Sequence, residues 1–286
     1  MAMSRHALSA LGSAGFHRLA YVAWGAPGSE RVLLCVHGLT RTGRDFDFIA
    51  AALEDSYRVV CPDVLGRGAS GWAASAKDYN TAQYVADATA LIARLGVERV
   101  DWLGTSMGGL MGLFAASLPG TPVRRLILND IGPFVPKASL ERIAAYVGKD
   151  PRFADIGGVE QYLRTVHAPF GALTDTQWRH LATHSARPLD DGKGGGGYGL
   201  AYDPAIGDAF RANPLADLDL WALWDRIECP VLVLRGAESD LLTRSVAEEM
   251  TQRGPKAELI EFPGCGHAPA LMAAEQIAAV RAWLLR

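Results

Sequence analysis

The stretch Arg99-Val100-Asp101-Trp102-Leu103-Gly104-Thr105-Ser106-Met107-Gly108 places a serine between two elements of different periodicity. The apolar run at 99–103 predicts a buried strand, and the pattern over 107–118 predicts a helix. Gly104 and Gly108 allow the close backbone approach that a tight strand-to-helix turn requires. A G-x-S-x-G motif in this context is typical of a serine nucleophile, whose hydroxyl is exposed next to the free N–H groups of a helix start.

Similar apolar runs recur on both sides of this motif. They lie at 32–36, 58–61, 125–128, 231–234 and 258–262. Such nearly continuous runs suit parallel strands that are covered on both faces. Helical patterns lie between several of them, notably over 80–95 and 271–285, and 17–24 reads as an earlier strand at the sheet edge. The alternation predicts an α/β fold, with a mostly parallel central sheet flanked by helices.

The alternation stops at Pro133 and resumes near Val231. We interpret 133–213 as an inserted, mainly helical cap, and 1–132 with 214–286 as the core. A separate small domain is the alternative, and the continuation of the sheet pattern on both sides argues against it. The run of four glycines at 194–197 predicts either a mobile lid edge or a passive surface loop.

Charge and composition exclude several classes of partner. The 286 residues carry a net charge of −3 and no block of five like charges, so neither a nucleic acid nor a polybasic membrane contact is expected. No apolar run approaches membrane-spanning length. The four cysteines form no CxxC pair, which favours buried, reduced thiols and a cytoplasmic location; they are Cys35, Cys61, Cys229 and Cys265. A small-molecule ligand is expected, and homo-oligomerisation stays open.

A serine nucleophile needs a base and an acid that orients the base. His267 follows the last predicted strand, in a loop where Gly264 and Gly266 precede it, and is the expected base. Asp240 follows the strand at 231–234 and is the expected acid, because the order Ser106, Asp240, His267 matches the chain order of this type of site. Glu238 and Asp130 are the rival carboxylates.

The loop His37-Gly38-Leu39-Thr40 follows the strand at 32–36. Such a loop can offer a backbone N–H to an oxyanion, and we expect the two donors to be the N–H groups of Leu39 and Met107. His37 is expected to be a packed structural histidine. Asp63 is expected to shape its own glycine-rich turn over 62–68.

A metal site is not expected from the remaining histidines. His180 and His184 have helical spacing, but no Glu follows the first, and no third ligand is evident in the sequence. A solvated helix face is the preferred interpretation.

With these motifs placed, the chain resembles the α/β-hydrolase superfamily over nearly its whole length. In detail it is similar to capped bacterial esterases, 3-oxoadipate enol-lactonases and cofactor-free haloperoxidases, which implies no metal and no organic cofactor. Haloalkane dehalogenases and epoxide hydrolases share the layout but carry Asp at the position of Ser106, so the resemblance implies acyl-enzyme chemistry here. The resemblance rests on His37-Gly38-Leu39, the turn from Asp63 to Ser70, Gly104 to Gly109, Asp240 and Gly266-His267.

The resulting expectation is hydrolysis of a carboxylic ester by Ser106, His267 and Asp240. A lactonase, a carbon–carbon bond hydrolase of aromatic degradation and a perhydrolase of the haloperoxidase type would share these residues and remain alternatives. The first two would take acidic substrates and should direct a cap arginine at the site. The candidates do not discriminate; they are Arg142, Arg152, Arg164 and Arg187. A ligand receptor without turnover is the remaining class, which an intact triad disfavours.

Overall fold

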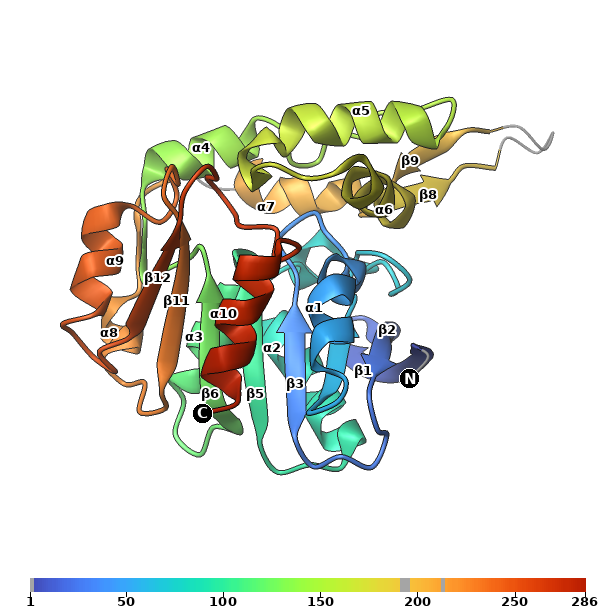
Figure 1. Cartoon of the computed structure of the whole chain (residues 1–286). Helices are drawn as coiled ribbons and strands as arrows, with labels where there is room; N and C mark the ends of the chain where they lie inside the picture. The colour runs from blue at the N-terminus through green and yellow to red at the C-terminus, as the bar shows by residue number, and fades with distance from the viewer. Residues whose placement is uncertain (1–2, 191–195, 212–213) are drawn as a thin grey trace.

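The structure is a computed structural model that describes residues 3–190, 196–211 and 214–286. An eight-stranded sheet runs through it in the order β1-β2-β4-β3-β5-β6-β11-β12 (Figure 1). The hairpin of β1 and β2 joins β4 in antiparallel fashion, and the pairs from β4 to β12 are parallel. The predicted α/β class and the mostly parallel sheet are confirmed. The strands are β1 (Ser4–Gly12), β2 (Gly15–Trp24), β3 (Val32–Val36), β4 (Arg58–Pro62), β5 (Val100–Thr105), β6 (Val123–Asn129), β11 (Val231–Gly236) and β12 (Glu258–Phe262).

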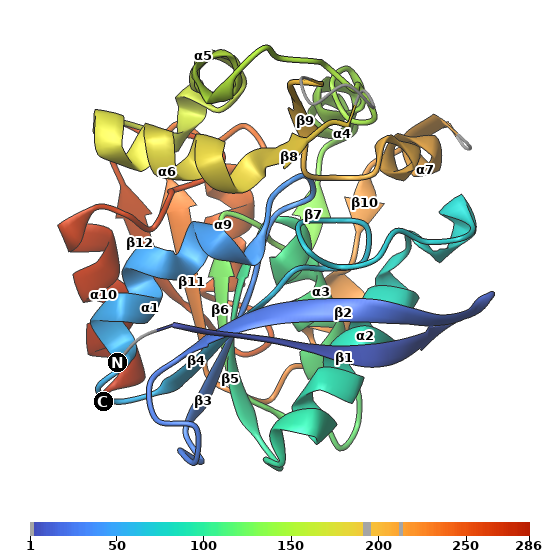
Figure 2. The same cartoon turned by 90° about the vertical axis from the view of Figure 1, so that its right-hand side faces the viewer.

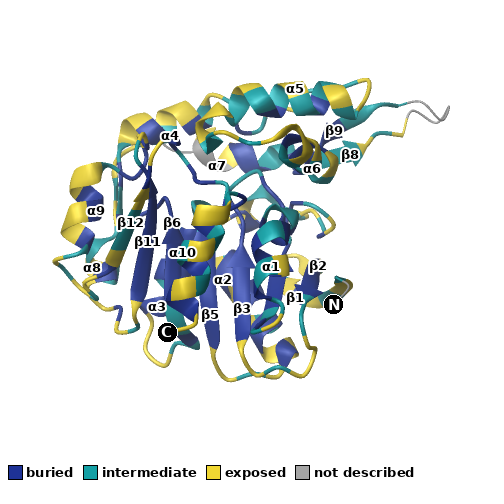
Figure 3. Cartoon of the chain, viewed as in Figure 1, coloured by how far each residue is buried: buried dark blue, intermediate teal, exposed yellow. Residues whose placement is uncertain are grey.

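Helices cover both faces of the sheet, and the strands bury side chains toward each of them (Figure 3). Along β3, Leu33 belongs to one hydrophobic cluster and Leu34 to the other, as the two-residue period of a strand requires. The cluster around Leu33 packs against α1 (Asp47–Leu53) and α10 (Ala274–Leu284). The other packs against α2 (Thr81–Leu95), α3 (Met107–Ala116) and α9 (Arg244–Met250). Burial on both faces explains why these strands lack a polar side.

Local signals set the ends of the helices that matter for the site. The side chain of Asn80 accepts a hydrogen bond from the N–H of Gln83 and begins α2. Gly96 ends α2 in the left-handed region, at φ 72°. In contrast, α3 begins directly after Ser106, whose side chain does not cap the helix. The first N–H groups of α3 are therefore available to another acceptor.

The part of the chain from β7 (Phe134–Val135) to α7 (Asp208–Arg211), between β6 and β11, lies across the carboxyl ends of the parallel strands (Figures 1 and 2). Its first element, β7, pairs with β10 (Leu218–Asp219), so the segment leaves and re-enters the core at one place. That arrangement supports our proposal that 133–213 is a cap. Gly194 and Gly195 lie outside the described residues. Whether the run 194–197 acts as a mobile lid edge or as a passive surface loop therefore stays open as a prediction. The main elements of the segment are α4 (Lys137–Ala144), α5 (Ile156–Val166), α6 (Asp175–Ser185), β8 (Ala186–Pro188), β9 (Tyr198–Leu200) and α7 (Asp208–Arg211); a short helix α8 (Trp221–Trp224) follows β10.

All four cysteines are free, and three of them, Cys35, Cys61 and Cys265, are buried. Their burial agrees with the expectation of packed thiols. Among the described helices, none combines the length and apolar character needed to cross a bilayer.

Candidate active site

Ser106 occupies a strained turn between β5 and α3, with φ 51° and ψ −115°. A non-glycine residue in this region is costly and persists only where the surroundings enforce it. At both flanking positions, contacts with neighbouring backbone leave no room for a side chain larger than that of glycine. A Cβ on Gly104 would lie 2.2 Å from the carbonyl oxygen of Gly108, and one on Gly108 would lie 2.0 Å from that of Val36. The motif therefore has glycines because β5, α3 and β3 approach backbone to backbone.

A continuous hydrogen-bond chain leads from this serine to a buried carboxylate. Ser106 Oγ lies 2.9 Å from His267 Nε2, and His267 Nδ1 lies 2.8 Å from Asp130 Oδ2. An ionised carboxylate can only accept, so Nδ1 carries a proton and Nε2 is the acceptor for the serine hydroxyl. That tautomer is the one a histidine base needs.

Asp130 is fully buried and has two further donors. Its Oδ1 accepts from the N–H of Gly236 at 2.8 Å, and its Oδ2 accepts from Ser239 Oγ at 2.6 Å. Hydrogen bonds of this kind offset the cost of burying a charge. The carboxylate is thus held in one orientation by the ends of β6 and β11 before His267 contacts it.

The expectation that Asp240 orients His267 is wrong. Its side chain is 54% exposed and forms a two-point ion pair with Arg142 of α4, at 2.7 and 2.9 Å. The backbone carbonyl of Asp240 also accepts from Ser139 Oγ at 2.8 Å. Asp240 therefore contacts the segment above the sheet and not the base. Glu238, the other rival, has no described contact with His267.

The order of the strands explains why Asp130 takes this place. In the sheet, β6 lies between β5 and β11, and Asn129 pairs with Thr105 on one side and with Leu234 on the other. Asp130, the residue that follows β6, therefore lies beside Ser106 at the carboxyl edge. The chain turns sharply there, since Asp130 has φ 56°. Chain order alone pointed to the loop after β11, one strand further away.

The two expected oxyanion donors lie on either side of the serine. Met107 is the first residue of α3, so its N–H has no acceptor within the helix. A Cβ on Gly38 would lie 3.8 Å from Ser106 Cβ, which puts the loop that carries Leu39 directly against the nucleophile. The role of Leu39 and Met107 stays a proposal, taken up below.

Arg67 is a residue that sequence reasoning missed, although it lies in the quoted turn. Its guanidinium is completely buried and donates from Nε to the carbonyl of Leu39 at 2.8 Å. Nη1 donates to the carbonyl of Leu65 and to Tyr84 Oη, at 2.7 and 2.8 Å, and Nη2 lies 3.4 Å from Met107 Sδ. One side chain thus contacts both residues expected to offer the oxyanion donors. The sequence of this turn gave no signal that its arginine points into the protein.

We expect Arg67→Met to lower both stability and ester turnover. Loss of the guanidinium leaves the buried carbonyl of Leu65 without this donor, at a cost of about 1–3 kcal/mol, and the partly buried carbonyl of Leu39 without its donor at a smaller cost. The Leu39 loop loses its anchor, so kcat should fall by about 10-fold or more while KM changes little. Thermal unfolding and p-nitrophenyl butyrate kinetics measure the two effects. An Arg94→Met variant on the exposed side of α2 is the control. Unchanged kcat in a folded Arg67→Met protein would contradict the positioning role.

His37 and Asp63 have the structural roles expected of them. His37 is buried, lies 2.7 Å from the carbonyl of Gly38 through Nδ1, and accepts from the N–H of Val64 through Nε2 at 2.9 Å. Burial lowers the pKa of His37 to about 4, so it stays neutral. Asp63 accepts from the N–H groups of Gly43 and Ala69, both at 2.8 Å, and so shapes its own turn.

The space next to the serine and histidine is small. A cavity of about 30 Å³ is lined by Thr105 and Ala268, their neighbours in the chain, and by Phe170 among others. A second cavity, of about 10 Å³, lies between the segment above the sheet and the core, lined by Arg41, His167 and Tyr202 among others. Burial, with the charges of Arg41 and His267, lowers the pKa of His167.

The four arginines considered as binding groups for an acidic substrate all face acidic side chains of the protein. They therefore do not distinguish an ester substrate from an acidic one. The pairs are Arg142 with Asp240, Arg152 and Arg187 with Asp150, and Arg164 with Glu160 and Asp175.

Asp47, His180 and His184 form a group that could supply three metal ligands, since one donor atom of each lies within 4.8 Å of the others. The two histidines are packed against the core, so the expected solvated face is wrong: His180 Nε2 lies 2.9 Å from the carbonyl of Arg44. The positively charged side chain of Arg44 already lies beside these donors. The guanidinium of Arg44 bonds the Asp47 carboxylate and lies 3.5 Å from His184 Nδ1. The donors therefore fit an arginine, and we assign no metal to them.

Comparison with known proteins agrees with this fold. A family model described as "Alpha/beta hydrolase family" matches residues 33–280. The chain is 50% identical over 270 residues to a 3-hydroxybutyrate-oligomer hydrolase from Cupriavidus necator, which covers 93% of this chain and 92% of the relative. A crystal structure from Rickettsia typhi superposes with a TM-score of 0.91 at 33% identity, covering 100% and 99% of the two chains. An alpha/beta hydrolase from Novosphingobium aromaticivorans gives 0.87 at 35% identity, with the same coverage.

Proposed function

Because the chain belongs to the alpha/beta hydrolase family, we propose that it is a serine hydrolase that cleaves carboxylic esters through an acyl-enzyme. The observation that carries the proposal is the chain of hydrogen bonds from Ser106 through His267 to Asp130. Asp130 replaces Asp240 in the acid role. The expected cap, 133–213, would close over the substrate, and the four free thiols support a reducing, cytoplasmic setting.

In the first half-reaction, Ser106 Oγ attacks the ester carbonyl carbon while His267 Nε2 takes the hydroxyl proton. Asp130 stabilises the imidazolium that forms, and the N–H groups of Leu39 and Met107 donate to the oxyanion. His267 then gives the proton to the departing alcohol oxygen. In the second half-reaction, His267 takes a proton from water as the water oxygen attacks the acyl carbon. The bond between that carbon and Ser106 Oγ then breaks, His267 returns the proton to Oγ, and the acid is released.

For the substrate, we propose short linear oligomers of 3-hydroxybutyrate. The support is the 50% identity, over nine-tenths of both chains, to the hydrolase of such oligomers. Each link of such an oligomer joins the carboxyl of one unit to the 3-hydroxyl of the next. The mechanism above cleaves that link and returns one secondary alcohol and one carboxylate.

We expect the purified protein to release monomer from 3-hydroxybutyrate dimer and trimer. Its kcat/KM for these oligomers should be at least about tenfold above that for p-nitrophenyl butyrate. The reason is that a binding site that pairs with the polar groups of its substrate rejects analogues that lack them. Chromatographic measurement of the released acid, against Ser106→Ala as a blank, tests this. Turnover of the p-nitrophenyl ester without any release from the oligomers would keep the esterase chemistry and reject this substrate.

A further inference from the structure

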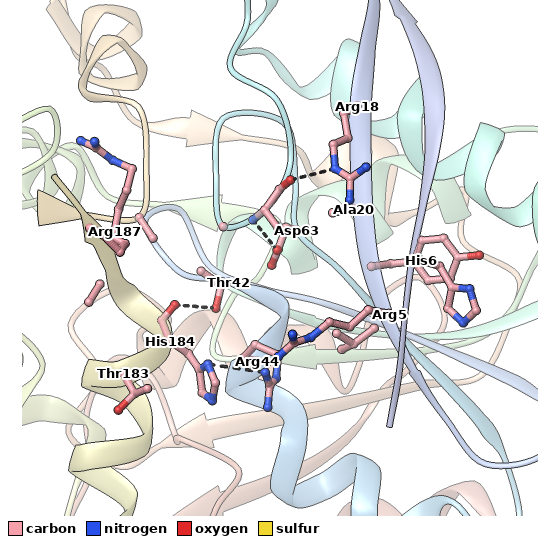
Figure 4. Close-up of a pocket in the computed structure, with 17 residues that line it drawn as sticks. Arg5, His6, Arg18, Ala20, Thr42, Arg44, Asp63, Thr183, His184 and Arg187 are labelled. Atoms are coloured by element: carbon pink, nitrogen blue, oxygen red, sulfur yellow. Dashed lines mark hydrogen bonds between the residues drawn. The ribbon is translucent and has the colours of Figure 1, made fainter. Parts of the chain in front are cut away.

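A cavity of about 350 Å³ lies on the side of the molecule where β1 and β2 meet η1 (Gly43–Phe46) and the β8–β9 hairpin (Figure 4). Its volume falls within the roughly 300–1,000 Å³ of small-molecule sites. Its lining is strongly basic although the whole chain is acidic. The charged residues among those that line it are four arginines and one carboxylate: Arg5, Arg18, Arg44, Arg187 and Asp63.

The negative charge in the lining is already engaged. Both oxygens of Asp63 accept from backbone N–H groups, and the carboxylate is largely buried. Arg44 is paired with Asp47, and Arg187 lies 3.9 Å from Asp150. For Arg5 and Arg18, the described part of the chain shows no ion pair. The cavity therefore has uncompensated positive charge.

Two of the arginines approach each other from different elements. Figure 4 shows the side chains of Arg5, from β1, and Arg44, from η1, extending toward each other with His184 beside them. Burial first, and then the charge of Arg44, lower the pKa of His184 to about 4, so this imidazole stays neutral and the guanidinium groups supply the charge. Two like charges that approach each other are unfavourable unless an anion lies between them.

A single layer of backbone separates this cavity from the cavity of about 10 Å³ between the segment above the sheet and the core. The N–H of Ala201 donates to the carbonyl of Ser185 at 2.7 Å. His184 and Ala201 line the basic cavity, whereas Ser185 and Tyr202 line the smaller one. Adjacent residues of the same segments thus face the two spaces. A ligand in the basic cavity would contact these segments on the side that faces away from the smaller cavity.

From this placement we propose that the basic cavity binds a small organic anion with phosphate or carboxylate groups, held by Arg5, Arg18 and Arg44 of the core, with residues of α6 and β8 lining the other side of the same space. Guanidinium groups match both kinds of oxyanion through paired N–H donors. Because the ligand bridges β8 to the core, it holds the β8–β9 hairpin in place. The site is distinct from the hydrolytic one and does not depend on its substrate.

The test is calorimetric titration of the whole protein with inorganic phosphate and, separately, with citrate, in a low-salt buffer free of both. The test variant is Arg5→Ala/Arg18→Ala, since both side chains are exposed and their removal spares the core. The matched control is Arg94→Ala/Arg244→Ala, which removes the same charge from exposed positions elsewhere. We expect binding in wild type and control, and at least about tenfold weaker binding in the test variant. The stronger of the two probes identifies the oxyanion class.

Two further readouts test separate parts of the proposal. Amide hydrogen exchange over 186–188 and 198–200 should slow when the anion is bound, and p-nitrophenyl butyrate turnover should survive in the test variant. Absence of binding by either anion at about 10 mM, or equal affinity in the test variant and wild type, would overturn the site. Binding with unchanged exchange would overturn the bridge. None of these outcomes depends on Ser106.

Discussion

Replacing Ser106 with alanine is expected to lower kcat for p-nitrophenyl butyrate by about 10⁶-fold, because the attacking atom is lost while the rest of the site remains. The free energy of unfolding should change little. Alanine has the same Cβ at the strained turn, and the contacts that enforce the turn come from Gly104 and Gly108. Steady-state kinetics and thermal unfolding measure the two quantities.

Labelling with a fluorophosphonate makes this result specific. The probe should modify wild type at Ser106 and leave the alanine variant unlabelled. Ser245→Ala, an exposed change of the same kind on α9, is the control and should behave as wild type. Labelling of the Ser106→Ala protein at another serine, with retained turnover, would remove Ser106 from the nucleophile role.

The second large effect concerns the acid. We expect Asp130→Asn to lower kcat by about 10⁴-fold, since an amide cannot stabilise the imidazolium and can hold His267 in the wrong tautomer. Asp240→Asn is the matched control, because it makes the same chemical change on the carboxylate that pairs with Arg142. Its kcat should stay within a few-fold of wild type, and its stability within about 1 kcal/mol, as for an exposed ion pair.

A loss of folding in Asp130→Asn would confuse the comparison, since the carboxylate also accepts from Gly236 and Ser239. Circular dichroism of both variants checks this. Fluorophosphonate labelling rates give a second readout, because a folded protein with a misoriented histidine should label slowly. A greater loss in Asp240→Asn than in Asp130→Asn would return the acid role to Asp240.

Much of the fold follows from local sequence. The buried strands have continuous apolar runs because both faces are covered, and the helices have caps or one-sided patterns. The first strand was missed because β1 is an edge strand in which Ala10 is the one fully buried residue, so it has almost no apolar signal. Its partner β2 was found because five of its residues are buried.

For the site, local motifs identify Ser106 and His267, since each depends on glycines next to it in the chain. The acid depends on which strands are neighbours, and a single sequence does not state the order of strands in a sheet. Arg67 shows a similar limit. Nothing in its surroundings distinguishes an arginine that points into the protein from one that points into water, and here the direction decides its role.

The ion pair between Asp240 and Arg142 has a consequence for how this protein can diverge. Since β6 supplies the carboxylate that contacts His267, the side chain of Asp240 is free to serve as an attachment point for α4, whereas Ser239 in the same loop still donates to Asp130. Substitutions at 142 and 240 can therefore change together in evolution without altering the groups that contact His267. The attachment of α4 and the catalytic hydrogen bonds can evolve as separate traits as long as Ser239 is kept.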